Sequence, residues 1–231
     1  MMKIKPVVDG IYLLPLKNVN AYLLEMEQGL VLIDTGLPGS EHEIITAIES
    51  LGHKRETLKS ILLTHCHTDH AGSAAALKRM LPHVKIYANA MDADIIENGL
   101  QMRPMTSAPG LLNKLLFRLF GKGTPVEPVQ IDVRLADGEH PDFSNDLMAV
   151  HLPGHCLGQL GFLHSGHGGI MFVADVATNM TGLGFSMGYE DIEVGKQSIR
   201  QLGQYDFGIA CFGHGRPIMR EASRRFQHML R

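Results

Sequence analysis

Short hydrophobic runs separated by turn residues fill the first third of the chain. Three of these runs are GIYLLPL, NAYLLEM and GLVLIDTG, and turn residues such as Asn18 and Gly29 lie between them. Apolar runs of this length, bounded by turn residues, are typical of strands. The pattern therefore predicts a meander of three strands at the start of the chain.

Helical spacing follows the third run. Ile44, Ile45 and Ile48 fall on one face of a helix expected from 41 to 51, and Ser40 is a candidate N-cap. The apolar run SILLT then predicts a buried strand.

From there, strands and helices alternate. Residues 71–80 are alanine-rich and predict a helix, and VKIYA predicts the next strand. The later elements are expected in DLMAVHLPG, GQLGFLHS and GGIMFVAD as strands, over 194–202 as a helix, in GIACFG as a strand and after Pro217 as a helix. This order is that of an α/β protein, so we expect an α/β (α+β) fold whose two halves share one layout.

One segment interrupts the alternation. Residues 99–128 carry four prolines around GLLNKLLFRLFGKG, which has an apolar stripe at i, i+4 spacing. The members of the stripe are Leu111, Leu112, Leu115, Leu116, Leu119 and Phe120. We expect an inserted helix, and three interpretations stay open: packing on the core, a lid for an apolar substrate, or docking on a second subunit or membrane surface.

Composition and charge narrow the class of protein. The chain has 231 residues, 45% of them hydrophobic and 19% charged, which is enough to bury a core and is far from the composition of disordered proteins. A formal net charge of −3 offers no basic surface to nucleic acid. We therefore expect a single domain over 1–231, with the insert at 99–128, and a small-molecule substrate.

The remaining composition signals concern location. MMKIKPVVDG has no secretory pattern, and no run of about 18 apolar residues predicts a membrane span. Cys66, Cys156 and Cys211 are too few, and odd in number, for a disulfide framework. We expect free thiols and a cytoplasmic location.

The stretch THCHTDHAG concentrates metal-binding side chains. Its four donors are His65, His67, Asp69 and His70. Imidazole and carboxylate bind divalent transition metals, and one ion usually takes three or four protein donors. Because a short segment does not easily wrap four donors around one tetrahedral ion, we expect two ions to share the cluster.

Two ions need further ligands, and three candidates follow later strand-like runs. His155 lies in LPGHCLG, Asp175 ends IMFVAD, and His214 lies in CFGHGRP. Functional loops of α/β folds collect at strand ends. The seven donors then divide into two sets that share one oxygen ligand. Asp34, at the end of VLID, is expected to orient a ligand histidine or the neighbouring backbone.

These motifs together resemble one family. HCHTDH, followed by PGHCLG, the VAD aspartate and the GHG loop, is similar to the metallo-β-lactamase superfamily, and VLIDTG extends the match to nearly the whole chain. The resemblance implies a four-layer αββα sandwich. It also implies that one metal binds His65, His67 and His155, that the other binds Asp69, His70 and His214, and that Asp175 bridges them. The implied cofactors are two Zn²⁺ ions, with iron or manganese as alternatives.

Such a pair of ions favours hydrolysis. It lowers the pKa of a bound water, supplies hydroxide near neutral pH and stabilises the oxyanion formed at a carbonyl. We expect cleavage of a carboxylic ester, thioester or lactone, with Asp69 and Asp175 as the catalytic residues that orient the water or move its proton.

The substrate stays open within this class. The ligand set resembles the glyoxalase II and lactonase branch, but the chain ends 17 residues after His214, where glyoxalase II relatives add a helical region. The lactonases place a tyrosine where this chain has Ala177 and Thr178, and Tyr189 is out of step. The alternatives are β-lactamase activity, phosphodiesterase or nuclease activity, and an iron-dependent redox member. A homodimer and an apolar acyl group on the substrate are further expectations.

Overall fold

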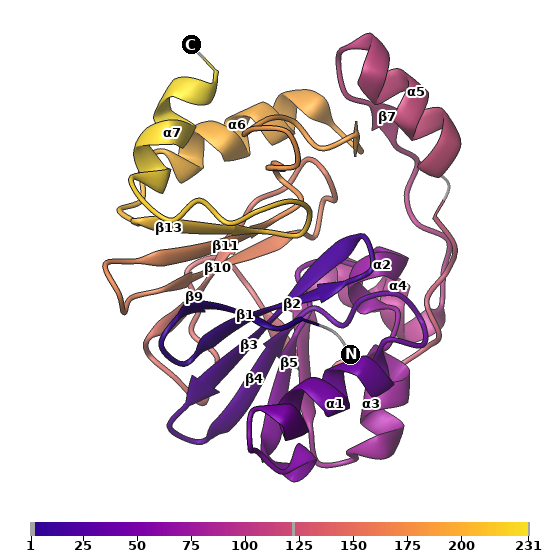
Figure 1. Ribbon diagram of the computed structural model, residues 1–231. Coiled ribbons are helices and arrows are strands. Elements are labelled where there is room, and N and C mark those ends of the chain that lie inside the picture. The colour runs from indigo at the N-terminus through magenta and orange to yellow at the C-terminus, as the bar shows by residue number, and fades with distance from the viewer. Residues whose placement is uncertain (1–2, 122, 231) are drawn as a thin grey trace. The chain divides into compact units, whose positions relative to one another are not determined.

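The computed structural model describes residues 3–121 and 123–230 (Figure 1). The chain forms two compact units. Unit 1 comprises Met1–Gln101 and Thr124–Leu135, and unit 2 comprises Met102–Gly123 and Ala136–Arg231. The single domain over 1–231 stays a prediction.

Unit 1 is built on a seven-stranded sheet of order β1-β2-β3-β4-β5-β6-β8. Its strands are β1 (Lys5–Val8), β2 (Ile11–Leu16), β3 (Val19–Met26), β4 (Gly29–Ile33), β5 (Leu58–Leu62), β6 (Lys85–Asn89) and β8 (Val133–Leu135). Neighbours from β1 to β4 pair antiparallel, whereas β4, β5, β6 and β8 pair parallel. The predicted meander is therefore β2, β3 and β4.

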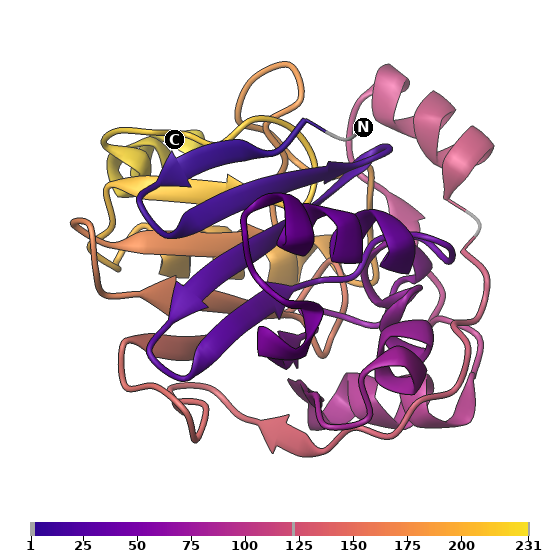
Figure 2. The same ribbon diagram turned by 60° about the horizontal axis from the view of Figure 1, so that its bottom comes forward.

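The helices of unit 1 are short. They are α1 (Glu41–Ser50), the 3-10 helix η1 (Arg55–Thr57), α2 (Thr68–Ala71), α3 (Ala74–Met80) and α4 (Ala90–Asn98). Helix α1 contacts β2 and α3 and buries its three isoleucines as the spacing predicted, and Figure 2 shows it in front of the strands. Ser40 occupies the N-cap position of α1, as predicted, but its side chain makes no capping hydrogen bond.

One helix prediction in unit 1 needs correction, and one helix of unit 1 was not predicted. The helix expected over 71–80 is interrupted at Gly72 and Ser73, so that α2 and α3 are separate. Helix α4 was not predicted, although its signals are in the sequence. The Asn89 side chain accepts a hydrogen bond from the Met91 backbone N–H, and Gly99 ends the helix in the left-handed conformation, with φ 56°.

Unit 2 is built on a four-stranded sheet of order β13-β11-β10-β9, with a small two-stranded sheet of β12 and β7. The strands are β7 (Thr106–Ser107), β9 (Leu147–His151), β10 (Leu160–His164), β11 (Ile170–Ala174), β12 (Gly188–Tyr189) and β13 (Ile209–Phe212). The helices are α5 (Leu111–Phe120), α6 (Ile192–Leu202) and α7 (Ala222–Met229). The helix expected in the insert is α5, but the side chains of Leu112 and Phe120 lie outside the described residues.

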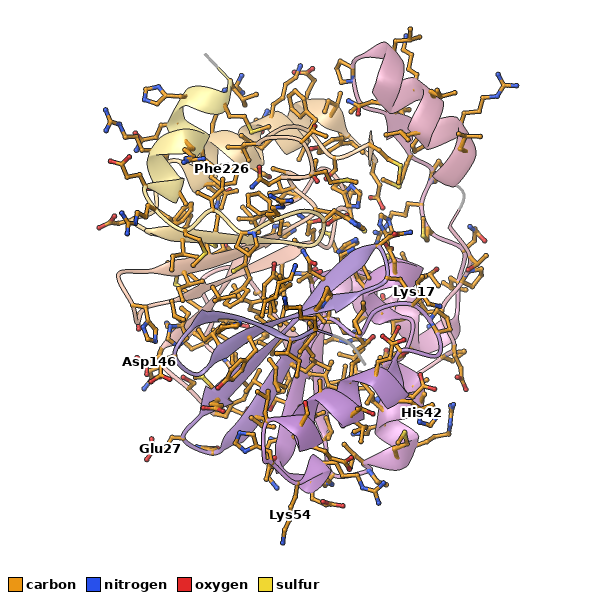
Figure 3. All side chains as sticks on the ribbon, in the orientation of Figure 1. Lys17, Glu27, His42, Lys54, Asp146 and Phe226 are labelled. Carbon is orange, nitrogen blue, oxygen red and sulfur yellow. The ribbon has the colours of Figure 1, made fainter. Side chains whose placement is uncertain are left out.

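Helices α6 and α7 pack on the four-stranded sheet of unit 2 and bury its core. Ile199 of α6 and Phe226 of α7 lie in one buried cluster with Val173 and Phe212 of the strands. The rings of Phe212 and Phe226 are stacked, with centroids 6.2 Å apart, and Figure 3 labels Phe226. The α/β class is confirmed, with one main sheet in each unit. Among the described residues, no helix has both the length and the apolar character needed to cross a bilayer.

Candidate metal centre

The HxHxDH segment of unit 1 follows β5 directly. His65 and His67 lie in the loop after the strand, and His67 occupies the N-cap position of α2. Asp69 and His70 lie within α2, as expected from the sequence. Gly72 permits close backbone passage here, because a Cβ at this position would lie 2.2 Å from the Thr68 carbonyl oxygen.

The four donors of this segment lie close together. His65 Nε2 is 3.0 Å from His67 Nδ1, and the rings of His65 and His70 have centroids 4.1 Å apart. Asp69 Oδ2 lies 3.8 Å from His70 Nε2. Two nitrogens bound at about 2.0–2.1 Å to one tetrahedral ion would be roughly 3.3 Å apart. The spacing of His65 and His67 is close to that separation.

A buried carboxylate at the end of β4 orients this cluster. Asp34 accepts hydrogen bonds from the Thr64 backbone N–H at 2.8 Å, from the Thr64 hydroxyl at 2.8 Å and from His70 Nδ1 at 2.8 Å. Thr64 Oγ1 in turn lies 2.9 Å from His65 Nδ1. With its proton donated to Asp34, this hydroxyl accepts from His65 Nδ1–H. The prediction that Asp34 orients a histidine and neighbouring backbone is confirmed.

A second acid of unit 1 holds the backbone between the first two histidines. The Cys66 backbone N–H donates to Asp92 Oδ2 at 3.0 Å, and both residues are buried. Asp92 lies in the first turn of α4. Asp92 was not predicted as part of the site, because the helix that carries it was not predicted.

The three donors of unit 2 also converge. Asp175 follows β11, His155 follows β9 and His214 follows β13. Asp175 Oδ2 lies 3.6 Å from His155 Nε2 and 3.1 Å from His214 Nε2. One carboxylate oxygen therefore lies near a donor nitrogen of both histidines.

The segment around β12 holds His155 in place. His155 Nδ1 lies 2.8 Å from the Gly188 carbonyl oxygen, and since that oxygen only accepts, the imidazole donates from Nδ1. The Tyr189 ring meets the His155 ring edge-on, with centroids 5.9 Å apart. Gly154, before the histidine, runs so close to α6 that a Cβ on it would lie 2.3 Å from Gly195 Cα.

His214 and Asp175 are fixed through their backbones. The His214 carbonyl accepts from the Asn179 backbone N–H at 3.1 Å and from the Thr178 hydroxyl at 3.0 Å. The Ser186 hydroxyl donates to the Asp175 carbonyl at 2.7 Å. Segment 176–190 thus holds all three donors of unit 2.

Tyr189 links two parts of segment 176–190 through its hydroxyl group. Its hydroxyl donates to the Val176 carbonyl at 2.7 Å and accepts from the Ser186 backbone N–H at 3.1 Å, and the side chain is fully buried. Burial raises the pKa of Tyr189. The phenol is therefore a neutral link within the segment, in keeping with its position out of step with the tyrosine of the lactonases.

Cys156, beside His155, lies among charged groups. Its Sγ is 3.3 Å from Glu190 Oε1, and Arg103 pairs with the same carboxylate oxygen at 3.5 Å. Glu190 Oε2 accepts from the Leu157 backbone N–H at 2.9 Å. Arg103 and Glu190 were not predicted from the sequence, because neither belongs to a motif and 87 positions separate them.

The donor set suits a transition metal. Five histidines and two aspartates supply imidazole and carboxylate ligands, which fit zinc and also iron or manganese. Unit 1 brings together the four donors of its motif, and unit 2 brings together the other three. In His65, His70 and His155, Nδ1 donates a hydrogen bond. Nε2 of each ring is therefore the candidate ligand atom.

The chain is similar to known proteins along most of its length. The model of the metallo-β-lactamase superfamily matches residues 14–214. YobT of Bacillus subtilis, an uncharacterised protein, is 35% identical over 153 residues, which are 65% of this chain and 58% of YobT. The probable metallo-hydrolase YflN of the same species is 27% identical over 90% of this chain and 85% of its own length.

A thioesterase and a solved β-lactamase are also similar. The thioesterase pkgB of Emericella nidulans is 26% identical over 88% of this chain, which spans 48% of pkgB. The subclass B3 metallo-β-lactamase BJP-1 of Bradyrhizobium japonicum superposes with a TM-score of 0.73 at 19% identity, covering 97% of this chain and 88% of that chain. The fold is that of the metallo-β-lactamases, mixed α/β with two main sheets. The chain therefore belongs to the metallo-β-lactamase superfamily.

Proposed function

We propose that this protein is a hydrolase whose seven donors serve two divalent metal ions, zinc in the first place. The observation that carries the proposal is the position of Asp175, whose Oδ2 lies near His155 Nε2 and near His214 Nε2. A ligand that bridges two ions must lie near donors of both, and the proposal assigns these two histidines to different ions. In this assignment His65, His67 and His155 hold one ion, Asp69, His70 and His214 hold the other, and Asp175 belongs to both.

When bound, the two ions supply a water of lowered pKa and stabilise negative charge on a carbonyl oxygen. The chain's own residues prepare the ligands for this. Asp34 fixes His70 directly and His65 through Thr64, and Gly188 fixes His155, so that each ring keeps its Nε2 for the ligand role. These contacts are made before a substrate arrives, which limits reorganisation during the reaction.

We assign the proton transfer to the two aspartates. Asp69 is only partly buried, so its carboxylate can accept a proton from water and pass it to solvent. Asp175 is buried, and its place between two histidines favours orienting the water over exchanging protons with solvent.

The proposed substrates are small carboxylic esters, thioesters or lactones. The name of pkgB, a thioesterase that matches 88% of this chain, supports the thioester. A net charge of −3 disfavours a nucleic acid, which requires basic contacts along its phosphates.

The test combines metal analysis with a substrate panel. We expect about two metal equivalents per purified chain and turnover of an acyl thioester or lactone above that of a phosphodiester or a β-lactam. Asp175→Asn should lower kcat/KM by at least about a hundred-fold, because it weakens a ligand of both ions. Asp146→Asn, an exposed site in the same unit (Figure 3), is the matched control and should retain full activity.

Two results would contradict the proposal. One is purified protein without stoichiometric metal that still turns over a substrate. The other is an Asp175→Asn variant that matches Asp146→Asn in both metal content and rate. If the protein preferred the phosphodiester, the proposed metal centre would stand and the proposed substrate class would be wrong.

A further inference from the structure

Helix α5 in the insert exposes an apolar face. Leu111, Leu115 and Leu119 have 86%, 53% and 63% of their surface exposed, and their spacing of four residues places them on one side of the helix. The opposite side is the one that packs. Phe117 lies against Gly188, where a Cβ would come within 2.5 Å of the phenylalanine ring.

Unit 2 anchors the base of this helix firmly. Thr106 and Ser107 of β7 pair antiparallel with Tyr189 and Gly188 of β12. The Arg103–Glu190 ion pair ties the start of the same segment to unit 2. Unit 2 therefore holds in place the helix that carries the exposed leucines. A contiguous apolar surface that a folded protein exposes to solvent usually marks a site that binds another molecule.

Charge around the leucines identifies the kind of occupant. Lys114 and Arg118 are exposed and lie one turn apart, three residues after Leu111 and Leu115 respectively, so they border the apolar row. Residues 100–126 contain four basic side chains and no acidic one, in a chain whose net charge is −3. A second copy of α5 would bring like charges together. A surface with both hydrocarbon and negative charge satisfies the leucines and the basic residues at once.

We propose that α5 docks on an anionic phospholipid surface. Leu111, Leu115 and Leu119 enter the boundary between headgroups and acyl chains, and Lys114 and Arg118 extend along it to the phosphates. None of these five residues is a donor of the metal centre, and docking requires no substrate turnover.

Vesicle flotation of the full chain tests the docking. The probes are vesicles of phosphatidylcholine alone and of phosphatidylcholine mixed with phosphatidylglycerol. We expect binding to the anionic vesicles that weakens with added salt. The Leu115→Gln, Leu119→Gln double variant should lower the partition coefficient at least about ten-fold. Arg118→Glu should lower it about five-fold or more on anionic vesicles only.

Matched controls separate this surface from general effects. Met180, in unit 2 outside α5, has 67% of its surface exposed, so Met180→Gln repeats the polar change elsewhere. Lys54→Glu repeats the charge change of Arg118→Glu at an exposed residue of unit 1 (Figure 3). Both controls should bind vesicles as the natural protein does, and thermal melting should show that all variants are folded.

Four outcomes would overturn the docking. The natural protein fails to float with anionic vesicles, or it floats equally with neutral ones. The α5 variants bind like their controls. Sedimentation shows a dimer that the leucine variants dissociate, which would make a second copy the occupant. None of these bears on hydrolysis, so failure here leaves the proposed function standing.

Discussion

His70 Nδ1 lies 2.8 Å from Asp34 Oδ2, and both side chains are buried. The two residues are 36 positions apart and meet because β4 and β5 pair parallel, which brings their carboxyl ends to one edge of the sheet. The same carboxylate accepts two hydrogen bonds from Thr64. One acid thus sets the orientation of His70 directly and of His65 through a hydroxyl.

Asp34→Asn should weaken metal binding about ten- to a hundred-fold, as loss of an outer carboxylate does in comparable sites. The amide keeps the shape of the side chain, and asparagine tolerates the left-handed backbone of this residue, with φ 61°. The loss of metal affinity would therefore result from the missing carboxylate charge and acceptor oxygen, with little effect from backbone strain. Competition with a chromophoric chelator measures the affinity.

Glu27→Gln is the control for this variant, since it removes the same charge from an exposed residue of unit 1 (Figure 3). Its metal affinity should equal that of the natural protein. If Asp34→Asn also held metal with unchanged affinity, the orienting role of Asp34 would be wrong.

Gly188→Ala should displace the His155 side chain by moving its hydrogen-bond partner. A Cβ at Gly188 would lie 2.5 Å from Phe117 Cε2, so the Phe117 ring or β12 must shift, and a shift of β12 moves the carbonyl that accepts from His155 Nδ1. We expect weaker metal binding and a loss of about 1–3 kcal/mol in the free energy of unfolding. Chelator competition and urea unfolding measure the two effects.

The matched control is Gly184→Ala, in the same connecting segment. The nearest atom to a Cβ there is 3.9 Å away, so the methyl group fits. If both alanine variants bound metal equally well, β12 would have no part in positioning His155.

The donors could be identified from the sequence, but most of the residues that position them could not. Each donor lies in a local motif after an apolar run, so the runs and motifs could be read directly. Asp34 was also recognisable, because it directly follows a strand and lies two residues before Gly36. Asp92, Glu190 and Gly188 act through contacts to residues far along the chain, and no local pattern marks such contacts. The break between α2 and α3 lies where Gly72 passes close to Pro38, a contact that no local pattern marks either.

Tyr189→Phe tests whether the tyrosine supports or reacts. Removing the hydroxyl leaves the Ser186 backbone N–H and the Val176 carbonyl without this partner, which should cost about 1–3 kcal/mol of stability. Turnover measured below the melting temperature should stay close to that of the natural protein. A large loss of kcat at unchanged KM and metal content would instead make the phenol part of the reaction.

The same variant has a pH signature. Burial raises the pKa of Tyr189 above its unfolded value near 10, so its contribution is fully present below about pH 10 and is lost as the pH rises further. In Tyr189→Phe the alkaline decline of unfolding free energy should be shallower. Equal alkaline slopes in the two proteins would contradict the burial of a neutral phenol.

His164, at the end of β10, should make unit 2 sensitive to acid. Burial lowers the pKa of His164; the Asp146 carboxylate opposes this shift and His167 adds to it. Because the folded pKa lies below the unfolded value of about 6.5, the contribution is complete above that pH. As the pH falls below about 6.5, the unfolded chain takes up the proton first and stability decreases.

His164→Gln should therefore lose less stability than the natural protein between about pH 8 and about pH 5.5, as urea unfolding at each pH would show. Contributions from all groups common to the two proteins cancel in this comparison. His42→Gln, at an exposed residue of α1 (Figure 3), is the matched control and should keep the natural pH dependence. If His164→Gln also kept it, the buried neutral state of His164 would have no effect on stability.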